Sequence, residues 1–315
     1  MMNLKKCVSL CSTVFCLAFT NIAWAQYTNA EIPENENTDA ISENYSKDDL
    51  DGVNILYDKA DSLTIETVLK AEKDNDKATA ATFARKFIGI PYVAHTLEGN
   101  EDECLVVNTR QMDCTTLVET ATALMLCHQR KMISFYDYCR MLLTIRYHKG
   151  RIDGYASRLH YFTEWIIDNE QKKIVDEVQK SSAPFNATQT IQVGFMSEHP
   201  EYYEALKRQP KLIMQIKDNE KRINGLIFRY IPKQDVGSSA AMREVVSDGD
   251  IIAITCSKKG LDIAHVGFAV WQENKLHLLN ASMIHKKVVL EPMTLKQYLS
   301  RHPSHTGIRV IRIND

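Results

Sequence analysis

The order of helical and strand-like segments along the chain predicts an α+β fold. Helical spacing of apolar residues runs from about residue 62 to residue 230, whereas the last third holds short β-rich runs separated by turn residues. Helices followed by a meander of strands are typical of helices packed on one face of an antiparallel sheet. The chain has 315 residues, 44% of them hydrophobic and 25% charged, which is enough to bury a full core.

The first 25 residues are expected to be a signal peptide rather than part of this fold. Lys5 and Lys6 precede an apolar stretch, 8–22, which leads into Ala23-Trp24-Ala25. This order is typical of a secretory signal that is cleaved after Ala25, and the apolar stretch is short for a bilayer span of about 20 residues. We therefore expect export without stable membrane insertion, to the periplasm if the host has an outer membrane and otherwise to the medium.

The remaining chain is expected to divide into a linker and one domain. Residues 26–50 are polar and acidic with almost no apolar period, so they predict a flexible linker. Residues 51–315 are expected to form a single domain and a monomer. The formal net charge of −2 provides no basic field for a phosphate backbone, so nucleic acid is not an expected partner.

The first and middle parts of this domain are predicted to be helical. Two helices are expected between residues 62 and 89, the second ended by Gly89 and Pro91. Their apolar positions are Leu63, Val68 and Leu69, followed by Ala80, Phe83, Ala84 and Phe87. The stretch 129–230 is expected to be a mostly helical insertion. Its markers are Leu159, Phe162 and Ile166 in one helix, and Ser197 with Pro200 at the start of another.

Five β-rich runs predict the strands of the sheet. They are Ile251 to Thr255, Val266 to Trp271, Leu276 to Leu279, Lys287 to Leu290 and Ile308 to Ile313. Turn residues separate them, so we expect them to pair as an antiparallel meander with helices packed against it.

Cys114 is the candidate nucleophile. Five cysteines follow residue 25, and an odd number leaves at least one thiol unpaired in an exported protein. Cys114 lies at the predicted start of a helix that Asp113 or Thr115 could cap. There the helix dipole and the free N–H groups favour the thiolate and could stabilise an oxyanion. The sequence leaves open whether this cysteine is merely structural, and whether any disulfide forms among Cys104, Cys127, Cys139 and Cys256.

His265 is the candidate base, and Asn280 is the candidate residue that orients it. His265 begins the second predicted strand of the meander, where its ring can face a helix start, and a histidine near a thiol can accept its proton. Asn280 lies at the end of the next strand and could hold the His265 ring, a logic met in other Cys-His-Asn sites. The sequence has no C-x-x-C or H-E-x-x-H spacing, so no metal is expected.

At these residues the chain resembles the NlpC-type cysteine peptidase superfamily, bacterial cell-wall hydrolases with a papain-like core. It is most similar to the N-acetylmuramoyl-L-alanine amidase-like branch. The matching stretches are Phe87-Ile88-Gly89-Ile90-Pro91-Tyr92, Thr96-Leu97-Glu98, Asp113-Cys114-Thr115-Thr116-Leu117-Val118-Glu119, Arg158-Leu159-His160-Tyr161-Phe162 with Trp165, Phe195-Met196-Ser197 with His199-Pro200, Gly249-Asp250, His265-Val266-Gly267 and Asn280-Ala281-Ser282. They extend from about residue 62 to the end.

The resemblance implies a papain-like core, a nucleophile helix on an antiparallel sheet, with an added helical segment. It implies Cys114 as nucleophile, His265 as base and Asn280 as the third polar residue, where many relatives have a histidine. The implied reaction is hydrolysis of the amide between N-acetylmuramic acid and L-Ala of muropeptides, preferably soluble 1,6-anhydro-muropeptides. No metal or organic cofactor is implied, and the domain would be a single cysteine amidase domain.

The expected substrate site is built from polar and aromatic side chains in the matching stretches. Tyr92 could place its hydroxyl near the reacting carbonyl, and Asp113 could contact substrate or simply cap its helix. The charge and aromatic faces that could hold sugars and carboxylates are those of Arg158, His160, Tyr161 and Trp165. Alternatively, Tyr161, Phe162 and Trp165 are helix core.

Three other functions remain compatible with the sequence. A conventional enzyme of this superfamily would cut the γ-D-Glu–diaminopimelate bond within the stem peptide. A catalytically silent protein would bind muropeptides without cutting them, although the intact Cys114, His265 and Asn280 argue against it. An acyl-enzyme intercepted by an amine would give transfer instead of hydrolysis. Recycling of the cell's own wall and antagonism of other cells would use the same chemistry.

Overall fold

The computed structural model describes residues 50, 52–237 and 239–314, and its centre is an eight-stranded sheet. The strand order is β4-β5-β10-β6-β7-β8-β9, and β3 also pairs with β10; every pairing in this sheet is antiparallel. The strands are β3 (Val175–Val178), β4 (Ala187–Thr190), β5 (Ile227–Pro232), β6 (Ile251–Cys256), β7 (Ile263–Gln272), β8 (Lys275–Ser282), β9 (Lys287–Leu290) and β10 (His305–Ile313). A separate parallel pair joins β1 (Ile55–Leu56) to β2 (Leu105–Val106).

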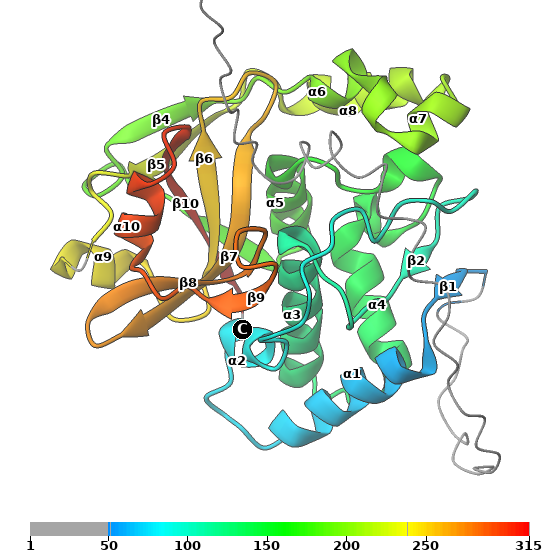
Figure 1. The fold of residues 1–315 in the computed structure, drawn as a ribbon, viewed down its shortest axis with the longest axis horizontal. Helices are drawn as coiled ribbons and strands as arrows, with labels where there is room; N and C mark the ends of the chain where they lie inside the picture. The colour runs from blue at the N-terminus through cyan, green and yellow to red at the C-terminus, as the bar shows by residue number, and fades with distance from the viewer. Residues whose placement is uncertain (1–49, 51, 238, 315) are drawn as a thin grey trace, which may run out of the picture.

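Helices cover both faces of this sheet (Figure 1). The helices are α1 (Lys59–Glu72), α2 (Ala80–Arg85), α3 (Cys114–Gln129), α4 (Phe135–Arg146), α5 (Phe162–Gln171), α6 (Phe195–Glu198), α7 (Glu204–Arg208), α8 (Leu212–Ile223), α9 (Ala240–Val245) and α10 (Leu295–Ser300). Helices α3, α4 and α5 lie together on one side, and α10 packs against β8 and β10 on the other. The α+β class predicted from the sequence is therefore confirmed, but helices pack on both faces of the sheet rather than on one as expected.

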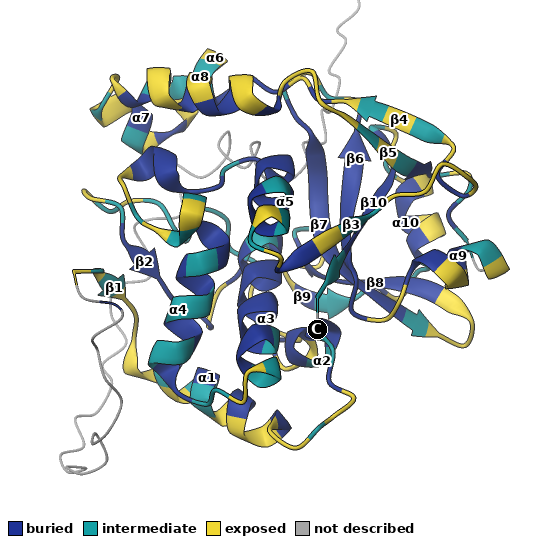
Figure 2. Ribbon diagram, turned by 180° about the vertical axis from the view of Figure 1, so that it is seen from behind, coloured by how far each residue is buried: buried dark blue, intermediate teal, exposed yellow. Residues whose placement is uncertain are grey.

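Alternating side chains along the central strands supply two hydrophobic cores. In β6, Ile251 and Ala253 belong to the core shared with α3, whereas Ile252 and Ile254 belong to the core shared with α10. A strand turns successive side chains to opposite faces, so a continuous apolar run serves both layers. Helix α3 is buried around most of its circumference (Figure 2), which makes it the central helix of the fold.

The C-terminal meander agrees with the sequence, but the middle of the chain differs from it. All five predicted strands are present, with β7 and β8 longer than expected. The stretch 129–230 contains β3, β4 and the start of β5 besides its helices, so the expectation of a mostly helical segment was incomplete. Pro200 does not open a long helix either: α6 ends at Glu198, and a short 3-10 turn covers Pro200–Tyr202. Leu63, expected on the apolar face of the first helix, is 56% exposed.

Some sequence-based predictions lie outside the described residues. The predicted signal peptide and nearly all of the predicted linker fall on residues 1–49, and Leu50 alone of that range is described. Within the described ranges, no helix combines the length and apolar character needed to span a membrane. None of the five described cysteines is in a disulfide.

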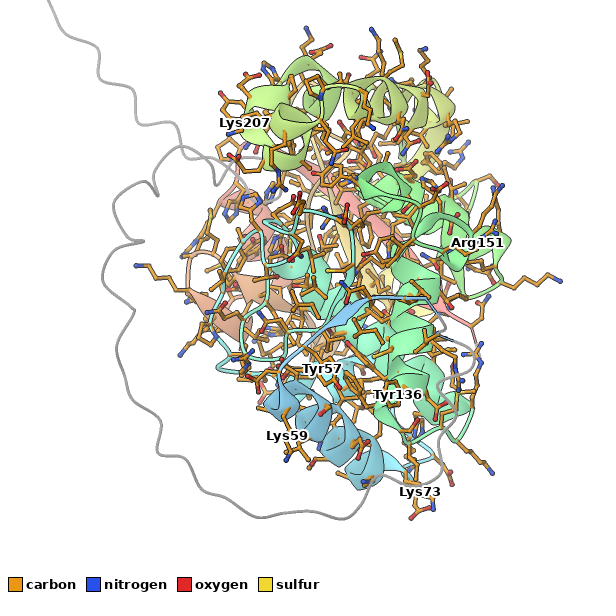
Figure 3. All side chains as sticks on the ribbon, turned by 90° about the vertical axis from the view of Figure 1, so that its right-hand side faces the viewer. Tyr57, Lys59, Lys73, Tyr136, Arg151 and Lys207 are labelled. Carbon is orange, nitrogen blue, oxygen red and sulfur yellow. The ribbon has the colours of Figure 1, made fainter. Side chains whose placement is uncertain are left out.

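Basic side chains project from both ends of the helical side. Figure 3 shows Lys59 at the start of α1 and Lys73 just after its end, both at one end of the molecule, with Lys207 on α7 at the other end and Arg151 on the flank between them. The helices α6, α7 and α8 form the end that carries Lys207 (Figures 1 and 3).

Candidate active site

Cys114 is the first residue of α3, and Asp113 caps that helix. The Asp113 carboxylate accepts a hydrogen bond from the Thr116 backbone N–H at 2.8 Å, and the Thr116 hydroxyl accepts one from the Asp113 N–H at 2.9 Å. This reciprocal capping box fixes the start of the helix at Asp113, so Cys114 is the first residue of its first turn.

 The cap thus places Cys114 in the first turn of α3, where free N–H groups and the helix dipole favour a thiolate.

His265 enters the site from β7, and a local irregularity aims it. The pairing of β6 with β7 changes register between Ile254 and Thr255, immediately before His265 on the opposite strand. A bulge of this kind bends a strand and redirects the next side chain. Gly267 then leaves room beside Asn280, because a Cβ atom at Gly267 would lie 2.9 Å from the Asn280 Cβ and 2.7 Å from the Leu279 carbonyl oxygen.

Asn280 in β8 holds the His265 ring. The Asn280 Oδ1 lies 2.9 Å from His265 Nε2, and both residues are buried. Burial lowers the pKa of His265, although the hydrogen bond to Asn280 and the charge of Glu291 oppose that effect. A neutral imidazole is the form that can take a proton from a thiol.

Cys114 and His265 line the same small cavity, together with His160 and Tyr161. A larger cavity of about 120 Å³ shares His160 and Tyr161 with it. This second cavity is also lined by Tyr92, Asp113 and Arg158. The structure therefore brings eight of the nine predicted site residues to two adjoining cavities or, for Asn280, to the back of His265.

Trp165 is the predicted site residue that the structure does not bring to either cavity. Its side chain is fully buried in α5 and stacks on Phe162, with ring centroids 5.0 Å apart and planes at 8°. Trp165 belongs to the same hydrophobic core as α3 and α4. This placement agrees with the alternative that Trp165 is helix core.

Arg158 reaches the larger cavity with its charge already countered. Its Nη2 lies 2.6 Å from the Glu98 carboxylate, and its Nε lies 3.4 Å from that of Glu103. The guanidinium also packs 5.0 Å from the centre of the Tyr155 ring. Burial raises the pKa of Glu103 despite the nearby Arg158. Arg158 therefore orders the cavity wall through its ion pairs with Glu98 and Glu103.

His160 and Tyr161 also make internal contacts that fix their orientation. The His160 Nε2 lies 2.9 Å from the Tyr155 carbonyl oxygen, so this nitrogen is the donor. Burial, aided by the charge of Arg158, lowers the pKa of His160 to about 3. The Tyr161 hydroxyl donates to the Glu220 carboxylate at 2.8 Å and accepts from the Met196 N–H at 3.0 Å. Both rings are thus rigid parts of the cavity wall.

Several residues near the site were not found from the sequence. Glu119 on α3, which also lines the larger cavity, forms a buried ion pair with Arg146 on α4, with 2.7 Å between Oε2 and Nε. Glu291 contacts the Asn280 amide. Glu98 and Glu119 stand in matching stretches without an assigned role, whereas Glu103, Arg146 and Glu291 lie in no recognisable motif. Only three-dimensional proximity reveals them. Among the described residues, no group of three or more His, Cys, Asp or Glu side chains could hold a metal ion.

Comparison with known proteins places these features in a family. Residues 82–308 match the family described as AmiA-like, N-acetylmuramoyl-L-alanine amidase-like. The chain is similar to a crystal structure of an N-acetylmuramoyl-L-alanine amidase from Bacteroides uniformis, with 37% identity and a TM-score of 0.70. That match covers 75% of this chain and 98% of the other. No curated protein matches the chain.

Two further solved structures are similar. A Bacteroides fragilis protein named as a candidate xylanase has 38% identity and a TM-score of 0.69, covering 74% of this chain and all of the other. A Legionella pneumophila protein with 21% identity and a TM-score of 0.60, covering 81% of this chain and 97% of the other, shares the fold.

Proposed function

The chain belongs to the N-acetylmuramoyl-L-alanine amidase-like family, and on that premise we propose that it hydrolyses the amide between N-acetylmuramic acid and L-Ala of muropeptides. The observation that carries the proposal is the shared cavity of Cys114 and His265, with Asn280 2.9 Å behind the His265 ring. A thiol at a helix start beside a neutral, oriented imidazole can perform nucleophilic acyl transfer without a cofactor.

The proposed reaction has two steps. The Cys114 sulfur attacks the carbonyl carbon of the lactyl group while His265 takes the thiol proton, and the free N–H groups of the α3 first turn stabilise the oxyanion. The carbon–nitrogen bond then breaks, His265 protonates the departing L-Ala amine, and a thioester remains on Cys114. Water attacks the thioester, giving its proton to His265, and the carboxylic acid leaves as the Cys114 thiol is restored.

The substrate is proposed to occupy the larger cavity. Its lining includes Tyr92, Asp113, Arg158, His160 and Tyr161, and it shares His160 and Tyr161 with the cavity that Cys114 lines. A soluble muropeptide, in particular one ending in a 1,6-anhydro sugar, is the expected form. We further propose that the domain has a papain-like, NlpC-type core. Residues 51–315 would form a single amidase domain with an insertion at 129–230. Residues 1–25 would direct its export, and the protein would act as a monomer.

Mass spectrometry of reaction products tests the proposal. The purified protein is incubated with a disaccharide–tetrapeptide that ends in a 1,6-anhydro sugar, and in parallel with its reducing-end counterpart. We expect intact disaccharide and intact tetrapeptide, formed faster from the anhydro substrate. Cys114→Ala and His265→Ala should abolish both products, whereas Cys127→Ala, which alters a buried thiol away from both cavities, should retain them.

The other products identify the competing functions. Cleavage inside the tetrapeptide would support the endopeptidase, and binding without cleavage would support the silent protein. Amide products formed after addition of a primary amine would indicate transfer. Xylan oligosaccharides are expected to remain intact, because the proposed reacting groups are a thiol and an imidazole rather than the carboxylate pair that glycosidases use.

A further inference from the structure

We propose that Glu291 is a positioning residue for His265, which acts by setting the orientation of the Asn280 amide. The inference rests on the proposed role of His265 as the base. Glu291 directly follows β9, and its side chain is 1% exposed. One carboxylate oxygen accepts a hydrogen bond from the Asn280 Nδ2 at 3.3 Å, and the other lies 3.1 Å from the Nε2 of His285.

The chemistry of an ionised carboxylate makes this contact directional. A carboxylate only accepts hydrogen bonds, whereas an asparagine amide has one accepting and one donating end. Glu291 therefore favours the orientation in which Asn280 turns its NH₂ group toward the carboxylate. The amide oxygen then faces His265, in agreement with the 2.9 Å contact between Asn280 Oδ1 and His265 Nε2. In the reverse orientation, the Asn280 oxygen would face the carboxylate with no proton between them.

The amide orientation determines which nitrogen of His265 carries the proton. Because the Asn280 oxygen can only accept, Nε2 of His265 must be the donor. A neutral imidazole has one N–H, so Nδ1 is left as the basic nitrogen. Glu291 thus selects, through Asn280, the tautomer in which Nδ1 takes the thiol proton. Orientation of a reacting histidine by an outer carboxylate follows the same logic as the outer partners of metal-bound histidines.

Other charged groups near His265 do not contact this amide. Asp113 raises the pKa of His265 and His302 lowers it, and His305 also lies close. Their effects are on the charge of the ring rather than on its tautomer. Control of the His265 tautomer therefore distinguishes the proposed role of Glu291 from the effects of these other charged groups.

Glu291→Gln tests the proposal with little change of shape. A glutamine amide can offer either its oxygen or its NH₂ to Asn280, so the amide orientation is no longer enforced. We expect kcat to fall roughly 10- to 100-fold with KM nearly unchanged. In an Asn280→Ala background, Glu291→Gln should have no further effect, because Glu291 acts through Asn280. Nitrogen-15 NMR of labelled histidine should show neutral His265 protonated at Nε2 in the parent. In the variant it should show a mixture of the Nε2–H and Nδ1–H tautomers.

Glu177→Gln is the matched control. Glu177 in β3 is another glutamate with a buried side chain, and its Oε1 lies 2.6 Å from the Nε of Arg309 in β10. Neither residue lines either of the two cavities. Its substitution should lower thermal stability without changing kcat or the His265 tautomer. Equal loss of kcat in both variants, or additive losses of Glu291→Gln and Asn280→Ala, would overturn the proposal.

A second readout separates this inference from the proposed function. The rate at which iodoacetamide alkylates Cys114 depends on His265 but needs no muropeptide. If the parent cleaves muropeptides and Glu291→Gln changes neither kcat nor the tautomer, the role of Glu291 is refuted while the amidase function stands. If the parent cleaves none, but Glu291→Gln alters the tautomer and slows alkylation, the role of Glu291 stands and the substrate is refuted.

Discussion

Cys114 differs from the other buried cysteines in the backbone that surrounds it. Burial raises the pKa of Cys127 and Cys139, which lie inside α3 and α4 where every neighbouring N–H is already bonded within the helix. Burial likewise raises the pKa of Cys104. Cys114 instead lies at the N-terminal turn of α3 and lines a cavity with His265. Position in the helix, rather than burial alone, therefore separates the candidate nucleophile from structural thiols.

This difference predicts selective alkylation. Iodoacetamide at neutral pH should modify Cys114 in the native protein and leave Cys127 and Cys139 unmodified until the chain is unfolded. The rate should fall about tenfold or more in His265→Ala, because the imidazole no longer takes the thiol proton. Peptide mapping by mass spectrometry measures the modified sites. Modification of Cys114 no faster than that of a model thiol would contradict an activated nucleophile.

The sequence sufficed to place the main residues of the candidate site but not their partners. Cys114 could be placed at a helix start, and His265 and Asn280 on neighbouring strands, because capping residues and β-rich runs are local signals. The ion pairs of Arg158 with Glu98 and Glu103 join residues about 55 to 60 positions apart. Such long-range contacts have no sequence period, and Glu291 is likewise set by the packing of β8 against β9.

At the scale of the elements, the β7–β8 hairpin and helix α3 define the site. The capping box fixes where α3 begins, and the bulge before His265 fixes where that side chain points. Gly267 is the residue that allows the two strands to carry His265 and Asn280 side by side, since a Cβ atom there would meet both a backbone oxygen and the Asn280 side chain.

Gly267→Ala should therefore disturb the site through the strands. We expect the free energy of unfolding to fall by about 1–3 kcal/mol, as for other overpacked positions, and activity to fall further because Asn280 is displaced from His265. Urea denaturation and the muropeptide assay measure the two effects. Gly237→Ala is the control, since a Cβ atom at Gly237 meets nothing within 4 Å. Parent-like activity of Gly267→Ala would show that the close approach is unimportant.

At the scale of the whole molecule, the sheet was easier to predict than the segment inserted before it. The strands β6, β7, β8 and β10 are buried along most of their length and stand out as β-rich runs. The missed strands β3 and β4 are four residues long and partly polar, and they are completed by pairing with distant β10 and β5. Pairing over such distances depends on the assembled fold rather than on local propensity.

His148 joins the helices of the inserted segment and makes the stability of that side depend on pH. Its Nε2 lies 2.9 Å from Glu164 and its Nδ1 lies 3.5 Å from Asp168, both on α5. Burial lowers the pKa of His148, but hydrogen bonds to Asp168 and Glu164 outweigh burial and the charge of Arg222, and raise its pKa to about 9. Protonated His148 therefore bridges two carboxylates in the folded protein.

The raised pKa predicts a pH window for this contribution. A histidine of the unfolded chain titrates near pH 6.5, so the stabilisation is fully present below about pH 6.5 and is lost as the pH rises through about 9. Its size should be on the order of 2 kcal/mol, since His148 is partly exposed. Urea unfolding of the parent and His148→Gln should differ most below pH 6.5 and converge above pH 9. An Asp168→Asn background should shrink the difference, because one of the two carboxylates is gone, whereas a difference that grows with pH would contradict the bridge.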